Sequence, residues 1–448
     1  MTRDLTKGKP TKLILVFVFP LIIANLFQQL HGLAEAFIVG NNLGVSSLAA
    51  IGSTGGVIFL IFGFGMGASS GLGIVTAQKF GSGNYEALRR SVATSIVLGV
   101  IISIGLTAIS APFAKSILQF LRTPEEIIEE AHIFLTIMLL GTIIAVFFNL
   151  IASIIRALGD SKTPLYIMVI AVVVNIALLY VFVLNLEMGA GAAAVAVLIS
   201  QFLSVVIGTI YIRKKIPILE LSSKDWKVTI SDLKEHARAA IPMGFSLSVI
   251  AIGTILVQFV LNGLGHIPVA AFTTALRIDQ VAVMPLNSFG VAMGTYVAQN
   301  YGAGKLHRVK EGVLKCSFIA IAFSIVIGVI NFVYGYTFTG FIVGADAYAS
   351  EVQRYAQVFL RINGALYIFL AFVFIFRFSL QGLGKNFAPA LSAVIESVMR
   401  VFAAFVLARG LGFVGICLSN PLAWIGAALP LMVIYFVTIK KMTLGKMK

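Results

Sequence analysis

Charged residues are scarce in this chain of 448 residues: Asp, Glu, Lys and Arg make up 11% of it, and hydrophobic residues 59%. With a mean hydropathy of +1.00, this composition excludes an ordinary soluble globular protein and is typical of a protein that crosses a membrane many times. Cysteine is also rare. Cys316 and Cys417 both lie in apolar runs, which argues against a disulfide framework or a cysteine-ligated metal site.

Acidic residues are the scarcer of the charged residues, with 18 Asp and Glu against 33 Lys and Arg. A basic excess can indicate nucleic-acid binding, but here the basic residues lie mostly in short connections between apolar runs. The positive-inside rule explains that distribution without a polyanionic partner. We therefore expect no nucleic acid, and a multi-pass protein of a bacterial-type inner (cell) membrane with both termini cytoplasmic.

Long hydrophobic runs occur six times before and six times after one polar stretch, which extends from Arg213 to Arg238. Each run is long enough to cross a bilayer with some tilt. The sequence therefore predicts an all-α polytopic membrane protein with two lobes of six transmembrane helices each. The predicted boundaries are an N-lobe at 1–212, a cytoplasmic linker at 213–239 and a C-lobe at 240–448. The first run is interpreted as a retained span and not as a cleaved signal peptide.

The two halves of the chain repeat one another. Phe19-Pro20 and Ile241-Pro242 begin corresponding helices, TAQKFGSG at 76–83 recurs as VAQNYGAG at 297–304, and RALGDSKTP at 156–164 recurs as QGLGKNFAP at 381–389. Six spans in each half give both repeats the same orientation, as in transporters whose repeats are related by an axis along the membrane normal. A duplication without any role in transport is the alternative interpretation.

A polar stripe runs along the first hydrophobic segment, where Asn25, Gln28, Gly32 and Glu35 follow one another at steps of three and four residues. On a helix these steps return to one face. An ionisable residue inside a membrane helix is costly and usually marks a functional site. Glu35 has no Lys or Arg at a matching depth in the first half, so it can take up and release a proton; the alternative is a carboxylate satisfied by a neighbouring helix. His31 either shares that proton or packs as a satisfied ring between helices.

The second half carries more charge within its apolar runs. These residues are Arg277, Asp279, Arg377, Glu396 and Arg400. Glu396 precedes Arg400 by four residues, which is the favourable order for an ion pair on a helix. We expect this C-lobe charge network to hold the helices in register. A polar lining for substrate and a second coupling site are the functional alternatives.

A glycine-rich run, GFGMGASSGLG at 63–73, lies inside an apolar segment. It lacks the lysine and the preceding strand of a nucleotide-binding loop. Small residues at this density are typical of close packing between membrane helices.

The motifs above, together with the N-terminal FPLIIANLFQQLHGLAEAFIVG, resemble the multidrug and toxin extrusion (MATE) family, nearest its DinF-like bacterial branch. The resemblance covers essentially the whole chain. It implies a two-lobe antiporter that exports amphiphilic or cationic drugs and toxic compounds by alternating access, driven by inward flow of protons or sodium ions.

The resemblance also bears on the coupling ion. In many MATE proteins the position of Glu35 is Asp, and other spans supply a Tyr, an Asn, a second Asp and a Thr. The matching positions here are Phe134, Asn175, Leu179 and Val197. By analogy with other hard cations, sodium needs roughly six oxygen ligands, and three of these side chains supply none. Proton coupling through Glu35, with Gln28 and Asn175 as hydrogen-bonding neighbours, is therefore favoured over sodium. We expect no cofactor and no bound metal.

Two other functions remain open at this stage. A flippase for a lipid-linked saccharide or lipid would share the two-lobe layout and would use a basic cavity, which the buried arginines could line. A membrane-embedded enzyme would need clustered catalytic residues, whereas the five histidines are scattered along the chain, so we expect no enzyme. The expected partners are a small-molecule substrate and membrane lipid, and the protein is expected to be a monomer.

Overall fold

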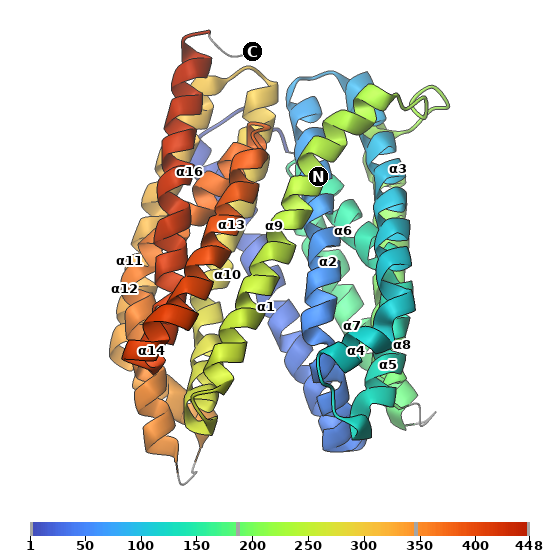
Figure 1. The fold of residues 1–448 in the computed structure, drawn as a ribbon. Helices are drawn as coiled ribbons and strands as arrows, with labels where there is room; N and C mark the ends of the chain where they lie inside the picture. The colour runs from blue at the N-terminus through green and yellow to red at the C-terminus, as the bar shows by residue number, and fades with distance from the viewer. Residues whose placement is uncertain (1–2, 185–188, 345–347, 446–448) are drawn as a thin grey trace. The chain divides into compact units, whose positions relative to one another are not determined.

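The computed structural model describes residues 3–184, 189–344 and 348–445, and all regular structure within these ranges is helical (Figure 1). Among the described residues, eleven helices are long and apolar enough to cross a membrane, or up to twelve when one bent pair is counted as a single span. The predicted fold class, an all-α polytopic membrane protein of about twelve transmembrane helices, is confirmed.

The first half contains the bent pair. Its helices are α1 (Pro10–Asn42), α2 (Gly44–Gly81), α3 (Tyr85–Ser110), the short 3-10 helix η1 (Ala111–Phe113), α4 (Ala114–Phe120), α5 (Glu125–Leu140), α6 (Thr142–Ala157), α7 (Lys162–Leu184) and α8 (Gly191–Lys215). Helices α5 and α6 meet at Gly141 with a bend of 49°. Gly141 packs directly against the side chain of Leu198 in α8, where a Cβ atom would clash.

The second half ends in shorter pieces. Its helices are η2 (Pro217–Leu219), α9 (Ile230–Asn262), α10 (His266–Gly302), α11 (Leu306–Val343), α12 (Ala349–Gly382), α13 (Phe387–Phe402), the π-helical turn η3 (Ala403–Leu407), α14 (Ala408–Leu411), α15 (Phe413–Cys417) and α16 (Ser419–Thr443). A π-helical turn interrupts the regular hydrogen-bond pattern of a helix. Here it separates α13 from α14, within a stretch that is apolar enough to count as one span.

The repeated motifs adopt the same local backbone in both halves. Gly83 and Gly304 have φ angles of 73° and 69°, and Gly159 and Gly384 have φ angles of 82° and 73°. All four glycines follow the end of a helix, where a left-handed residue terminates it and glycine has no Cβ atom to clash. The sequence repeat is thus also a repeat of helix-ending turns.

The chain forms two compact units. Unit 1 comprises Phe19–Ser248 together with Arg3 and Asp4, and unit 2 comprises Leu5–Val18 and Val249–Lys448. These bounds differ from the predicted lobes, because the chain passes between units after Asp4 and again at two crossing points within helices, in α1 after Val18 and in α9 after Ser248. Each of these helices has 33 residues and is roughly 50 Å long, which is enough to take part in both units. Pro20 and Pro242 lie near the two crossing points.

Candidate functional site

The polar stripe of the first segment lies on the continuous helix α1. Glu35 and His31 are half-buried within unit 1, and Gln28 is exposed. A Cβ atom added at Gly32 would meet nothing within 4 Å. The face that carries Glu35 therefore has open space beside it, and its carboxylate is neither fully enclosed nor fully exposed.

A hydrogen bond joins this stripe to α7. His31 Nε2 donates to Asn175 Oδ1 over 2.6 Å, although the two residues are 144 positions apart in the chain. Asn175 is 1% exposed, and its Nδ2 has no hydrogen-bond partner. His31 is also close enough to Glu35 to interact with it electrostatically. The structure therefore brings three of the predicted residues, His31, Glu35 and Asn175, together in unit 1.

An apolar cluster lies on the C-terminal side of Glu35. Phe134 and Leu179 are buried in it, and Val197 packs against it. Helix α1 contributes Ile38 and Val39, about one turn beyond Glu35. Three of the positions that the MATE pattern pointed to, Phe134, Leu179 and Val197, thus meet in space, and they provide hydrocarbon only. In residues 3–184, 189–344 and 348–445, no group of three or more His, Cys, Asp or Glu side chains is placed to hold a metal ion.

The acidic member of the C-lobe charge network lies between two guanidinium groups. Arg377 Nη2 donates to Glu396 Oε2 over 2.6 Å, and Arg400 Nη2 donates to Glu396 Oε1 over 2.8 Å. The side chains of Arg377, Arg400 and Glu396 are only 8%, 11% and 5% exposed. This buried triad joins α12 to α13, as expected for a cluster that holds helices in register.

Comparison with known families identifies the chain. The model of the MatE family matches residues 20–181 and 242–406, which is more than half of the sequence. This chain belongs to the MatE family. The two matched stretches coincide with the two sequence repeats, and together they include Glu35, His31 and Asn175 in the first and the whole C-lobe charge network in the second.

Relatives and solved structures agree with this assignment. The chain is 27% identical over 308 residues to the probable multidrug resistance protein YpnP of Bacillus subtilis, which covers 68% of each chain. It is 26% identical over 441 residues to the probable multidrug resistance protein YoeA of the same organism, covering 96% of this chain and 94% of that one. An outward-facing structure of a multidrug resistance MATE family transporter matches with a TM-score of 0.90 at 22% identity, over 98% of this chain and 97% of that chain, which shows the shared fold. The chain is a multi-pass membrane transporter of the MatE family.

The rest of the predicted C-lobe network was wrong. Arg277 is exposed, whereas its neighbours Ile278 and Asp279 are buried, because successive residues on a helix point about 100° apart. Asp279 has a different partner: Tyr367 donates its hydroxyl to Asp279 Oδ1 over 2.6 Å. The five residues therefore form no single network in this MatE protein, and the ion pairs are confined to Arg377, Glu396 and Arg400.

Sequence analysis also missed two polar residues beside Asp279. Asn331 Nδ2 donates to the Tyr367 hydroxyl over 2.9 Å, and the ring of Tyr367 lies 6.0 Å from that of Trp424. Helices α10, α11 and α12 thus share one buried hydrogen-bonded chain. Asn331 is an amide inside an apolar run. Amides in membrane helices commonly hydrogen-bond to another helix, so this position was the signal in the sequence that could have identified it.

Proposed function

We propose that this MatE transporter is a proton-coupled antiporter that exports amphiphilic or cationic drugs and toxic compounds, with Glu35 as the coupling residue. The observation that carries the proposal is a half-buried carboxylate on a polar stripe, beside the His31–Asn175 hydrogen bond and next to an apolar cluster. The similarity to YpnP and YoeA, both named as probable multidrug resistance proteins, supports drugs as the substrate class.

The preference for protons over sodium rests on the available ligands. A hard cation in a protein takes roughly six oxygen ligands, but Phe134, Leu179 and Val197 offer none. Glu35 and Asn175 do carry side-chain oxygens, but Oδ1 of Asn175 already accepts the His31 hydrogen bond. A proton needs only one basic oxygen, and the Glu35 carboxylate provides it.

Coupling then follows from charge. An ionised Glu35 attracts either a cationic substrate or a proton, and one excludes the other. Protonation from the outer side neutralises the carboxylate, ends its attraction to the substrate cation, and favours release of the substrate outward. Loss of the proton to the inner side restores the charge for the next substrate. The proton gradient thereby biases alternation between inward-open and outward-open states.

The flippase alternative has lost part of its support. It depended on three arginines that line a basic cavity, but Arg377 and Arg400 are paired with Glu396, which leaves the exposed Arg277 as the one of the three that could attract an anionic headgroup. We therefore retain drug export as the function.

Reconstituted transporter tests the proposal directly. Proteoliposomes are loaded with a cationic dye, a pH gradient or a sodium gradient is imposed, and dye movement is followed by fluorescence. We expect transport to follow the pH gradient and to ignore sodium. Transport that requires sodium and ignores pH would contradict proton coupling, and movement of a lipid-linked saccharide in place of the dye would contradict drug export.

We also propose that the transporter is a monomer of the inner (cell) membrane with both termini cytoplasmic. A fluorescent protein fused to the C-terminus should fold and fluoresce, and alkaline phosphatase fused there should be inactive. The opposite pair of results would place the C-terminus outside.

A further inference from the structure

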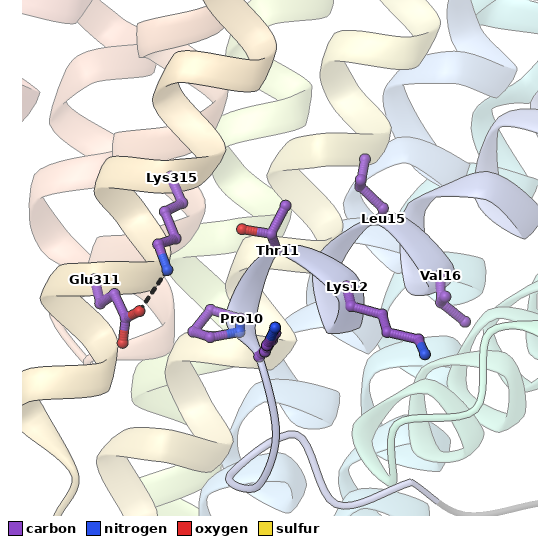
Figure 2. Close-up of a pocket in the computed structure, with 8 residues that line it drawn as sticks. Pro10, Thr11, Lys12, Leu15, Val16, Glu311 and Lys315 are labelled. Atoms are coloured by element: carbon purple, nitrogen blue, oxygen red, sulfur yellow. Dashed lines mark hydrogen bonds and ion pairs between the residues drawn. The ribbon is translucent and has the colours of Figure 1, made fainter.

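A groove in unit 2 lies outside the candidate coupling site. It has a volume of about 680 Å³ and is lined by Lys9, Pro10, Thr11, Lys12, Leu15, Val16, Glu311 and Lys315. These residues come from the first two turns of α1, with the residue before it, and from the beginning of α11. Figure 2 shows Glu311 and Lys315 of α11 facing the first turn of α1.

The groove is strongly basic. It has three lysines and one carboxylate, and Glu311 is already paired with Lys315 over 2.5 Å. Lys9 and Lys12 are both exposed. In addition, the amide groups in the first turn of a helix have no carbonyl partner within it, and they favour an anion at that end. The charge of the groove is therefore complementary to an anion.

The inner end of the groove is apolar. Leu15 and Val16 are 43% and 37% exposed, one turn further along α1 than Lys12. On α11, Leu314 and Phe318 are 59% and 65% exposed. Both helices begin at the basic end, so lysines come first and exposed hydrocarbon follows. This is the order of headgroup and acyl chain in a phospholipid. Free phosphate, in contrast, would make no favourable contact with the exposed apolar side chains.

The α1 side of the groove is held in place by the second copy of the repeated motif, 297–304, and by residues just after it. Four side chains there hydrogen-bond to the backbone before α1: Gln299 to Leu5 N at 2.8 Å, Asn300 to Leu5 O at 3.2 Å, Lys305 to Thr6 O at 3.1 Å and Arg308 to Gly8 O at 2.8 Å. The lysines of the groove are thus carried on an anchored segment of unit 2.

We propose that this groove binds an anionic phospholipid of the cytoplasmic leaflet, with the phosphodiester at Lys9, Lys12 and Thr11 and the acyl chains along Leu15 and Phe318. The proposal rests on the cytoplasmic N-terminus proposed above. Basic sites at the cytoplasmic end of membrane helices are suited to anionic headgroups. A lipid bound there fastens the beginning of α1, the helix that leaves unit 2 after Val18 and carries Glu35 in unit 1.

Lipid binding to the purified full-length protein in detergent tests this proposal. Native mass spectrometry counts retained dioleoyl phosphatidylglycerol, with dioleoyl phosphatidylcholine as the neutral comparison. Each lysine contributes to the free energy of binding an anionic headgroup. Lys9→Gln combined with Lys12→Gln should therefore weaken phosphatidylglycerol binding by about tenfold or more. The matched control is Lys440→Gln with Lys441→Gln, two exposed lysines in the last turn of α16, which should leave binding unchanged. The proposal would be overturned if both double variants lost phosphatidylglycerol binding equally, or if the Lys9→Gln and Lys12→Gln variant lost none.

Two further measurements keep the test decisive if the double variant misfolds. Glu311→Gln removes the only carboxylate of the groove and releases Lys315, so it should tighten phosphatidylglycerol binding; unchanged or weaker binding would overturn the proposal. Inorganic phosphate at millimolar concentration should not displace the lipid, and full displacement would assign the groove to free phosphate. Both are binding measurements, so they are independent of whether Glu35 couples transport, and the C-terminal fusions test the orientation separately.

Discussion

Arg377 donates a hydrogen bond to Glu396 from a guanidinium group that is itself almost fully buried, over 2.6 Å. Arg400 adds a second bond to the same carboxylate. If Arg400 were the sole partner of Glu396, as their separation of four residues in the sequence suggests, its removal would leave a buried carboxylate unpaired. The structure changes that expectation, because Arg377 keeps the carboxylate paired.

The carboxylate is therefore the more sensitive member of the triad. Glu396→Gln leaves two buried guanidinium groups without a counter-charge, and breaking a buried pair in this way lowers the free energy of unfolding by about 3–5 kcal/mol. Arg400→Met should lower it by less. Thermal unfolding in detergent measures both, with Arg277→Met on an exposed position as the control. An Arg400→Met variant as unstable as Glu396→Gln would show that Arg377 does not compensate.

Tyr367→Phe tests the buried hydrogen-bonded chain around Asp279. The substitution keeps the ring but removes the donor to Asp279 and the acceptor for Asn331. We expect a loss of about 1–3 kcal/mol in the free energy of unfolding, the usual effect of leaving a buried polar group unpaired. Tyr334→Phe, on a residue that is 55% exposed, should be nearly neutral. If the two variants are equally stable, the hydrogen bonds of Tyr367 to Asp279 and Asn331 do not contribute to stability.

Two glycines of α2 allow the effect of close helix packing to be distinguished from the intrinsic helix propensity of glycine. A Cβ atom at Gly67 would lie 2.4 Å from the carbonyl oxygen of Met243 in α9, whereas one at Gly55 would meet nothing within 4 Å. Gly67→Ala should therefore destabilise the protein by about 1–3 kcal/mol, and Gly55→Ala should stabilise it by up to about 1 kcal/mol. The two melting temperatures give the answer. A tolerated Gly67→Ala would mean that α2 and α9 do not pack this closely.

Asp160 predicts a pH dependence of stability. Its Oδ1 accepts hydrogen bonds from the backbone N–H groups of Lys162 and Thr163 at the start of α7, both over 3.0 Å. Burial raises the pKa of Asp160, but the hydrogen bonds from Thr163, together with other favourable interactions of the carboxylate, outweigh that effect, so its pKa is below the ordinary value of 3.8. The unfolded chain then binds the proton first as the pH falls. The stabilisation by Asp160 is thus complete above about pH 4 and is lost as the pH falls through the lowered pKa.

Asp160→Asn isolates that contribution. The difference in melting temperature between the wild type and this variant should be constant from neutral pH down to about pH 4, and it should shrink below that. A difference that widens on acidification would have the opposite sign and would contradict the lowered pKa.

Much of the fold was predictable because it depends on local properties. Hydrophobic run length gave the number of spans, and the motifs that repeat in the sequence also repeat in the structure, with positive-φ turns at Gly83 and Gly304. The passage of α1 and α9 between units was not predictable, because it depends on which helices pack together over long separations. For the same reason the close packing of Gly141, at the bend between α5 and α6, against Leu198 was not predictable.

The candidate site was predictable to a similar extent. Helical spacing identified the stripe that ends at Glu35, and the pairing of Glu396 with Arg400 followed from their separation of four residues. The bond from Tyr367 to Asp279 spans 88 positions, and that from His31 to Asn175 spans 144. Residue spacing along the sequence cannot predict hydrogen bonds between positions so far apart. The exposure of Arg277 depends on the rotation of α10, which hydropathy does not define.

Glu35 carries the central claim, and one substitution tests it most directly. Glu35→Gln keeps the size and hydrogen bonding of the side chain but cannot bind or release a proton. The measurement is dye efflux from proteoliposomes under an imposed pH gradient, alongside Glu35→Asp, which should retain partial activity, and with melting temperature as the check on folding. The account predicts that Glu35→Gln folds normally and moves dye no faster than protein-free liposomes; transport at the wild-type rate would contradict it.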